Sequence, residues 1–268
     1  MGAHCAVIYT EKKLEAKEAA QRVLEILQKR GLSAEIYSAG EIIGKKLSSA
    51  VDSIIALGGD GTVLKSIKAL SNSNALVLGI NFGRGGFLME AEGSMLDEAV
   101  ESFLDGKYGV EKVMMISAVV NGEEVGDALN EIYVTSGLLG KTLDLRIVKK
   151  TELTRIIADG LIISTPIGST AYAYSAGGPI VEDKIEAAIL VPVCPISNSR
   201  AMVLSLSEGL EVNILSEYGV SMLIDGFVKK HFDGKSVRLI VRKSEKTVNF
   251  VRLGLGESFA RRLRKKAR

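Results

Sequence analysis

The fold class is decided by residues 53–65, which read Ser-Ile-Ile-Ala-Leu-Gly-Gly-Asp-Gly-Thr-Val-Leu-Lys. The apolar run Ile54–Leu57 is typical of a buried parallel strand, because such strands are covered on both faces. A Gly-Gly-Asp-Gly turn follows at 58–61, and we expect Thr62 to open a helix. The stretch therefore predicts a strand, a tight turn and a helix N-terminus in succession.

The turn at 58–61 has the character of a phosphate-binding site. Glycines let a ligand approach the main chain, and the first N–H groups of the following helix have no partner within the helix. Together with the helix dipole, these N–H groups favour a bound phosphate. Asp60 is unexpected there, because a carboxylate repels phosphate unless it takes part in chemistry or holds a metal. The alternative is that Asp60 only caps the helix starting at Thr62.

The composition argues against several classes of protein. The chain has 268 residues, 47% of them hydrophobic and 25% charged, which is enough for one large or two modest domains. A net charge of +2 gives no strong field for binding nucleic acid or a membrane surface. There is no apolar run long enough to span a bilayer and no signal-peptide pattern at the N-terminus. Small-molecule substrates are therefore expected, without nucleic-acid or membrane partners.

Cysteine and histidine are scarce in the sequence. Cys5 and Cys194 lie far apart, so they do not form a metal-ligand cluster, and a reduced cytoplasmic protein is the simplest interpretation. His4 and His231 are the only histidines, which argues against a catalytic triad or a zinc site built on histidine. We expect no metal-ligating residues in this chain.

Strands and helices alternate in the first part of the chain, residues 1–107. The expected strands are 5–9, 34–38, 53–57 and 75–80, and the expected helices are 11–30, 62–70 and 94–104. This alternation predicts a parallel α/β sheet, in which ligands bind beyond the carboxyl ends of the strands. The glycine-rich turns at 58–61 and 83–86 both come at such ends.

The second part, residues 108–250, reads as mainly β, a sandwich or a related layered sheet. Helical periodicity is scarce, and Asn121-Gly122 is a strong hairpin turn. The expected strands are 114–120, 125–135, 143–149, 153–163, 186–193, 201–206, 210–215, 220–224 and 236–241. We place the domain boundary near Gly106–Gly109, and we expect the two domains to form a site together. Residues 251–268 form a C-terminal segment with a basic tail.

Two further stretches carry candidate binding groups. A second glycine-rich turn lies within Gly79–Leu88, where Arg84 is able to meet a phosphate. Asn130-Glu131 places two polar residues inside the otherwise apolar strand 128–134. The alternative for this pair is a strand edge that faces solvent.

The longest candidate stretch is 159–179. An expected strand runs into a segment dense in hydroxyls and glycines, which then enters an expected helix at Thr170. Hydroxyls and free N–H groups suit a ribose and a pyrophosphate, and Tyr172 offers a flat face for stacking a ring. A simple Ser/Thr-rich turn does not account for so long a stretch.

In this order, the Gly-Gly-Asp-Gly-Thr motif at 58–62, Asn130-Glu131 and the 159–179 block resemble the NAD kinase family. The resemblance extends from residue 5 to about 255. The first motif is shared with phosphofructokinases, diacylglycerol kinases and sphingosine kinases, whereas the block from Gly168 to Pro179 is far more specific. The resemblance implies an N-terminal α/β domain for the phosphate donor, an all-β domain for NAD, and a chain end that returns to the first domain.

The implied reaction transfers phosphate from ATP, or from another polyphosphate, to the 2′-hydroxyl of the adenosine ribose of NAD, which gives NADP. The resemblance makes Asp60 the proton acceptor and assigns the donor phosphates to Gly59, Gly61 and Thr62. Lys65 matches a binding position of the family and could reach either NAD or the donor phosphate. Mg²⁺ would bridge those phosphates, held mostly by nucleotide and water. The resemblance assigns the dinucleotide contacts to Asn130, Glu131, Lys141, Asp159, Ile167, Thr170, Ala171, Tyr172, Ser175 and Cys194.

The family usually forms dimers or tetramers, so the resemblance implies a homodimer or homotetramer. Lys141 matches a family position that binds NAD, sometimes from a neighbouring subunit.

The sequence departs from the family pattern at three places. Residues 83–88 read Gly-Arg-Gly-Gly-Phe-Leu where the third residue is usually Leu, and residues 192–196 lack the histidine of the family's Pro-Ile-Cys-Pro-His run. Asp225-Gly226-Phe227 replaces an Asp-Gly-Gln pattern whose amide contacts ligand in some relatives. These departures leave the preferred donor open.

Two alternatives to an NAD kinase follow from the shared first motif. A lipid or sugar-phosphate kinase would show an apolar acceptor channel or additional basic residues, and neither is evident around 164–175. A non-catalytic NAD(P)-binding sensor on the same fold has no need of a carboxylate among phosphates, and Asp60 is present.

Overall fold

The computed structural model describes residues 4–83, 86–196, 198–256 and 263. Its chain forms two compact units, which are Met1–Val113 together with Thr247–Arg268, and Met114–Lys246. The first unit is thus built from both ends of the sequence. The long strands β6 (Gly109–Val120) and β17 (Ser236–Arg252) each contribute residues to both units.

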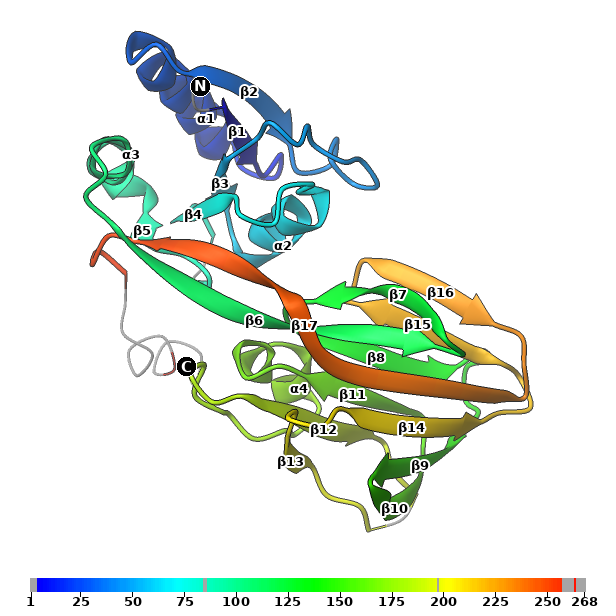
Figure 1. Ribbon diagram of the computed structural model, residues 1–268. Coiled ribbons are helices and arrows are strands. Elements are labelled where there is room, and N and C mark those ends of the chain that lie inside the picture. The colour runs from blue at the N-terminus through cyan, green and yellow to red at the C-terminus, as the bar shows by residue number, and fades with distance from the viewer. Residues whose placement is uncertain (1–3, 84–85, 197, 257–262, 264–268) are drawn as a thin grey trace. The chain divides into compact units, whose positions relative to one another are not determined.

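The first unit is a parallel sheet flanked by helices (Figure 1). Its strand order is β2-β1-β3-β4, and the outer edge of β4 pairs with both β5 and the end of β17, all in parallel. The strands are β1 (His4–Tyr9), β2 (Ser33–Ser38), β3 (Ser53–Gly58), β4 (Leu76–Asn81) and β5 (Ala91–Glu92). The parallel α/β architecture predicted for this part of the chain is confirmed.

Helices α1 (Leu14–Lys29) and α3 (Leu96–Leu104) share one hydrophobic core with the sheet. A short 3₁₀ turn, Gly93–Met95, precedes α3. Helix α2 (Asp60–Ala69) packs against β3, β1 and β4. All six residues of β3 are buried, which explains why its sequence is a continuous apolar run and not an alternating one.

The second unit consists of two β-sheets. One sheet includes β10-β9-β14-β17, with β6 beside β17 and β7 beside β6, and the other has the order β13-β12-β11-β8-β15-β16. The strands are β7 (Glu123–Ala128), β8 (Glu131–Ser136), β9 (Leu143–Lys149), β10 (Thr151–Ala158), β11 (Gly160–Ser164), β12 (Ala187–Val193), β13 (Met202–Ser205), β14 (Leu210–Leu215), β15 (Val220–Ile224) and β16 (Val228–Phe232).

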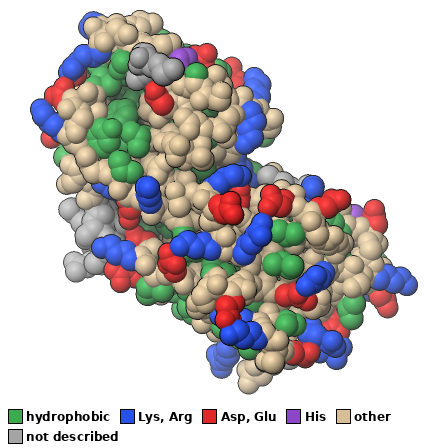
Figure 2. Space-filling model, viewed as in Figure 1, with side chains coloured by type: hydrophobic (Ala, Val, Ile, Leu, Met, Phe, Trp, Pro, Cys, Tyr) green, Lys and Arg blue, Asp and Glu red, His purple; other side chains and the backbone are tan. Residues whose placement is uncertain are grey.

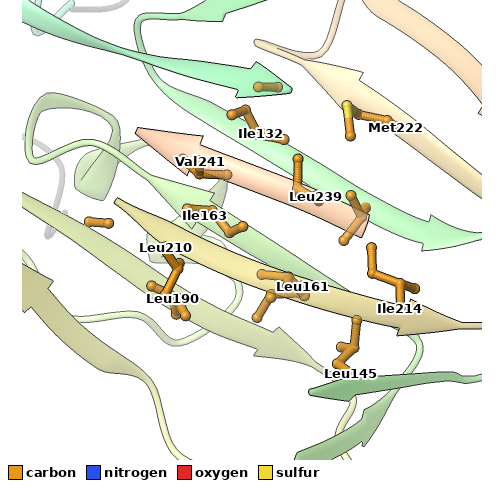
Figure 3. Packing of buried hydrophobic residues seen from close by; sticks show 14 of the residues in the cluster. Ile132, Leu145, Leu161, Ile163, Leu190, Leu210, Ile214, Met222, Leu239 and Val241 are labelled. Atoms are coloured by element: carbon orange, nitrogen blue, oxygen red, sulfur yellow. The ribbon is translucent and has the colours of Figure 1, made fainter. Parts of the chain in front are cut away.

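A single hydrophobic core joins the inner faces of these two sheets. Leu145, Ile214 and Leu239 come from one sheet and meet residues such as Leu161 and Met222 of the other (Figure 3). Alternate residues of each strand point into this core, as expected for sheets that pack face to face. The sandwich predicted for the second half of the chain is confirmed.

The outer face of the β10-β9-β14-β17 sheet carries paired charges. Arg155 donates two hydrogen bonds to Asp144 on the neighbouring strand, at 2.8 and 2.5 Å, and these lower the pKa of the Asp144 carboxyl. Arg238 donates one hydrogen bond, from Nη2, to Glu211 Oε2 at 2.6 Å. Figure 2 shows positive and negative side chains interspersed over this part of the surface instead of gathered by sign. Exposed pairs of this kind contribute little stability individually.

Two strands predicted as continuous are each divided by a corner. The run 125–135 splits into β7 and β8, and the run 153–163 splits into β10 and β11. In both cases the chain leaves one sheet of the sandwich and enters the other, at Leu129–Asn130 and at Asp159. Because residues on both sides of a corner are buried, the apolar pattern continues through it and conceals it.

Smaller differences affect the ends of elements. Helix α2 begins at Asp60, two residues before the predicted start at Thr62. The predicted helix at Thr170 is a 3₁₀ turn, Ile167–Thr170, followed by the single turn α4, Tyr172–Ser175. The sequence prediction missed β5 and β16, and it ended the last strand at residue 241, whereas β17 continues to Arg252.

A half-buried carboxylate ties β7 to β6 and β17. Asp127 accepts hydrogen bonds from Ser117 (2.6 Å), Ser244 (2.8 Å) and Lys246 (2.8 Å). Burial alone raises the pKa of this carboxyl, but the bonds from Lys246, Ser117 and Ser244 lower it by more, so that the net shift is downward.

Asp127→Asn is expected to lower the free energy of unfolding at pH 7 by about 1–3 kcal/mol, because hydrogen bonds to a charged group are lost. A lowered native pKa stabilises the fold above the ordinary carboxyl pKa, and this contribution disappears as the pH falls through the native value. Urea unfolding at pH 7 and below about pH 4 should therefore show the difference from wild type shrinking with acid. The exposed Glu123→Gln serves as control, and a difference independent of pH would contradict a role for the Asp127 charge.

Candidate functional site

Asp60 lies at the start of α2, directly after β3, and its side chain turns to the second glycine-rich stretch. One carboxylate oxygen accepts the N–H of Phe87 at 3.0 Å, and the other accepts the N–H of Leu88 at 2.9 Å. The N-cap of α2 is Gly59, and no side chain caps this helix. The alternative that Asp60 merely caps the helix is therefore wrong. Two main-chain amides therefore hold the carboxylate in one orientation.

The two glycine-rich turns pack against each other. The N–H of Phe82 donates to the carbonyl of Gly58 at 2.8 Å, and the N–H of Gly83 donates to Asn81 Oδ1 at 2.8 Å. A Cβ at Gly86 would lie 2.7 Å from Asp60 Oδ1, so only glycine lets the loop come this close. Arg84, which we expect to meet a phosphate, lies outside the described residues.

The predicted phosphate cradle is only partly available. A Cβ added at Gly59 or Gly61 would meet nothing within 4 Å, so both positions border open space. Thr62 is different, because it is buried and its N–H donates to the Gly59 carbonyl at 2.8 Å. Lys65 is half-buried one turn further along α2. The open part of the cradle therefore consists of the two glycines at the helix N-terminus.

In the second unit, one buried aspartate organises the corner that carries Asn130 and Glu131. Asp225 accepts the N–H of Leu129 at 3.1 Å, of Asn130 at 2.7 Å and of Glu131 at 3.2 Å. Its own N–H donates to the carbonyl of Glu131 at 2.9 Å. Sequence reasoning noted Asp225 only as part of a departing motif. Asp225 has a φ of 49° and is followed by a glycine, so it is a turn residue whose backbone conformation sets the direction of its side chain.

Asn130 and Glu131 are 9% and 7% exposed, so the alternative of a strand edge facing solvent is wrong. The carbonyl of Asn130 accepts the N–H of Thr165 at 2.8 Å and the hydroxyl of Ser164 at 3.1 Å. A Cβ at Gly168 would lie 2.1 Å from the same carbonyl. The 159–179 block is therefore locked onto this corner through main-chain contacts.

Tyr172 stands at the surface beside this corner and is 43% exposed. Its ring meets the Tyr133 ring edge to face, with centroids 5.3 Å apart. Burial, and then the neighbouring Tyr133, raise the pKa of the Tyr172 hydroxyl, with smaller contributions from Cys194 and Glu131. The hydroxyl is therefore protonated at physiological pH and remains a hydrogen-bond donor.

The remaining candidates are spread along β8 and β11. Glu131 pairs with Ser164 at one end of these strands, and Gly160, next to Asp159, pairs with Thr135 at the other. Five residues of strand span about 16 Å. Only an extended ligand would contact both ends.

The other predicted dinucleotide contacts differ in exposure. Ala171, Ser175 and Cys194 are partly or fully exposed, whereas Ile167 and Thr170 are buried. Lys141 does not lie at the end of β8 that follows Asn130. It follows β8 and lies over the Tyr218 ring, 5.5 Å from the centroid.

Comparison with known proteins places this geometry in a family. Residues 41–108 match the family model of the ATP-NAD kinase N-terminal domain, and residues 129–253 match that of the ATP-NAD kinase C-terminal domain. The chain belongs to the NAD kinase family. The resemblance carried by the Gly-Gly-Asp-Gly-Thr motif and the 159–179 block is thereby confirmed, and the family assignment favours neither a lipid or sugar-phosphate kinase nor a non-catalytic sensor.

Curated relatives agree over most of the chain. An NAD kinase from Methanothermobacter thermautotrophicus is 36% identical over 94% of this chain and 92% of its own length. An NAD kinase from Pyrococcus abyssi is 33% identical over 92% of both chains.

Solved NAD kinase structures have the same fold. A structure of the Archaeoglobus fulgidus NAD kinase in complex with ATP covers 98% of this chain and 99% of its own, with a TM-score of 0.78 and 28% identity. The yeast NADH kinase complexed with NADH aligns over 98% of this chain and 86% of its own, with a TM-score of 0.83, and at 20% identity it supports the fold alone.

The described part of the chain offers little for a resident metal or a reactive thiol in the core. Within it, no three or more His, Cys, Asp or Glu side chains gather where they could hold a metal ion. Cys5 is buried, and burial raises the pKa of its thiol to about 11, whereas Cys194 is exposed. Among the described helices, none combines the length and apolar character needed to cross a membrane.

Gly168→Ala is expected to weaken NAD binding at least tenfold and to cost about 1–3 kcal/mol of stability, because the new methyl group overlaps the Asn130 carbonyl. Thermal unfolding and NAD titration would measure the two effects. Gly234→Ala is the matched control, since its Cβ would meet only the Ser236 carbonyl at an ordinary 3.4 Å. Wild-type NAD affinity in a folded Gly168→Ala protein would separate this corner from the dinucleotide site.

Proposed function

We propose that this NAD kinase transfers the terminal phosphate of ATP to the 2′-hydroxyl of the adenosine ribose of NAD, with Asp60 as the proton acceptor. The observation that carries this proposal is the fixed carboxylate of Asp60, held by two loop amides beside an open helix N-terminus. ATP is supported as donor by the Archaeoglobus fulgidus relative, which was solved with ATP. Another polyphosphate remains an alternative donor.

The chemistry requires the ribose O–H bond to break as the new O–P bond forms and the terminal P–O bond of ATP breaks to release ADP. A carboxylate is a weak base, so Asp60 takes the proton late, in a loose transition state where position and charge matter most. The Phe87 and Leu88 N–H groups hold the two carboxylate oxygens of Asp60 in position, so the side chain does not have to change rotamer before it accepts the proton.

The donor phosphates would bind at the N-terminus of α2. Gly59 and Gly61 border open space there, so that a phosphate could approach their main chain, and the helix dipole favours the anionic phosphates. Thr62 would support the turn from within, because its N–H already has a partner, and Lys65 would neutralise donor charge from the next turn.

Mg²⁺ would be held by the donor phosphates and water. When bound, it would neutralise charge that develops on the transferred phosphate.

NAD would bind along β8 and β11 of the second unit. Asn130 and Glu131 supply polar groups at one end of these strands, and Asp159 lies at the other. Tyr172 would pack against a ring of the dinucleotide, and Ala171, Ser175 and Cys194 would border it. The buried residues Ile167 and Thr170 would shape the pocket from behind its surface.

A homodimer or homotetramer stays a prediction. Lys141 follows the end of β8 opposite Asn130, so a role in binding NAD suits a site on a neighbouring subunit better than the Asn130 end of its own chain.

Asp60→Asn is expected to lower NADP formation from NAD and ATP by about 10²–10⁴-fold, the usual contribution of a positioned base. The amide keeps the size of the side chain, so the NAD dissociation constant should change by less than about twofold. Turnover would be followed as NADP produced with ATP and with polyphosphate, each with and without Mg²⁺. The exposed Asp105→Asn is the control, and wild-type turnover in Asp60→Asn would remove Asp60 from the mechanism.

Tyr172→Ala should weaken NAD binding by about 1–3 kcal/mol, because an aromatic face is lost from the pocket. Tyr172→Phe keeps the ring and its contact with Tyr133, so its affinity should stay within about threefold of wild type. Calorimetric titration with NAD would compare the two. Unchanged affinity in the alanine variant would place the pocket elsewhere.

A further inference from the structure

We propose that Glu90 is a positioning residue for Asp60. Glu90 anchors loop 86–90 to the returning C-terminal segment, and this loop in turn fixes the position of the Asp60 side chain. The proposal rests on the proposed role of Asp60 as proton acceptor. Glu90 is 3% exposed and lies three residues from the Phe87 amide that contacts Asp60.

Glu90 makes three contacts with residues 252–256. Its Oε1 atom accepts the N–H of Leu253 at 2.7 Å and the N–H of Gly256 at 3.2 Å. Its Oε2 atom lies 3.3 Å from Nη1 of Arg252. A Cβ at Gly256 would come within 2.8 Å of the same oxygen, so the main chain of 252–256 closes directly around the carboxylate.

Loop 86–90 is short and leads from Glu90 to the catalytic carboxylate. The amides of Phe87 and Leu88 end on Asp60, while the N–H of Glu90 donates to the Gly79 carbonyl of β4 at 2.8 Å. A Cβ at Gly79 would lie 2.9 Å from the Leu88 carbonyl, so this loop lies tightly over β4. Because the loop is short and tightly packed, a displacement of Glu90 would be transmitted to the Phe87 and Leu88 amides.

A charged residue at such a buried place is costly unless its hydrogen bonds are needed. An apolar side chain would fill the space at lower cost, but it would leave the Leu253 and Gly256 amides without this acceptor. Arg252 is shared with Glu111, whose Oε2 lies 2.6 Å from Arg252 Nε. Glu111 contacts the same arginine from β6 and not from the loop, which makes it a matched control.

Glu90→Gln tests the proposal because it keeps an acceptor for the two amides but turns an NH₂ group toward Arg252. We expect kcat to fall about 10–100-fold, since a misplacement near 1 Å in a catalytic group costs about this much, with KM for NAD within about threefold of wild type. Glu111→Gln should keep kcat within about threefold. An equal loss of kcat in both variants, or wild-type kcat in a folded Glu90→Gln protein, would overturn the proposal.

A double mutant separates this proposal from the one on which it rests. If Glu90 acts through Asp60, adding Glu90→Gln to Asp60→Asn should cause no further loss of the residual turnover. A further loss equal to that seen in wild type would overturn positioning while leaving Asp60 as the base. Full activity of Asp60→Asn alone would instead overturn the assignment of the base, and positioning with it.

Gly256→Ala provides the same test if Glu90→Gln does not fold. Its new methyl group would press on Glu90 Oε2 without removing any charge. It should lower kcat in the same direction with an unchanged KM for NAD, and wild-type kcat in this variant would count against the proposal.

Discussion

The approach of one loop to one carboxylate constrains the first unit more than any other contact. For the Phe87 and Leu88 amides to reach Asp60, the loop must pass where no Cβ fits at Gly86, and it must lie on β4 where none fits at Gly79. The turn after β3 and the turn after β4 are therefore packed together, and the conformation of each depends on the other. An aspartate in a phosphate-binding turn is tolerable because its charge is matched by main-chain donors.

The second unit uses a sandwich corner for a comparable purpose. A chain that passes from one sheet to the other must interrupt its ladder, which frees main-chain groups for other partners. At 129–131 these groups are taken by the Asp225 carboxylate and by residues 164–165. The buried corner can therefore carry the polar side chains of Asn130 and Glu131 while its backbone stays ordered. Both units thus hold a candidate site in which backbone amides converge on an acidic side chain, half-buried at Asp60 and buried at Asp225.

Most strands of this protein could be predicted from its sequence because burial on one or both faces leaves a clear periodic pattern, as in β3, β9 and β14. The corners at Leu129–Asn130 and Asp159 could not, since the apolar pattern runs through them. The motifs indicated Asp60, Asn130 and Tyr172 as candidates, but they gave no partners. Glu90 and Asp225 were missed as organising groups because their bonds go to amides 163 and 96 positions away, and a main-chain amide leaves no trace in the sequence.

Strand β17 has a consequence for how the protein is made. Its residues 249–250 pair with Leu76 and Val77 of β4, and the segment after it closes around Glu90. Until the ribosome has released this stretch, the sheet of the first unit has an open edge, and an open edge invites pairing with other chains. The first unit is completed only by residues that follow the second unit in the sequence, so a fragment cut after residue 113 would expose the part of β4 that residues 249–250 cover.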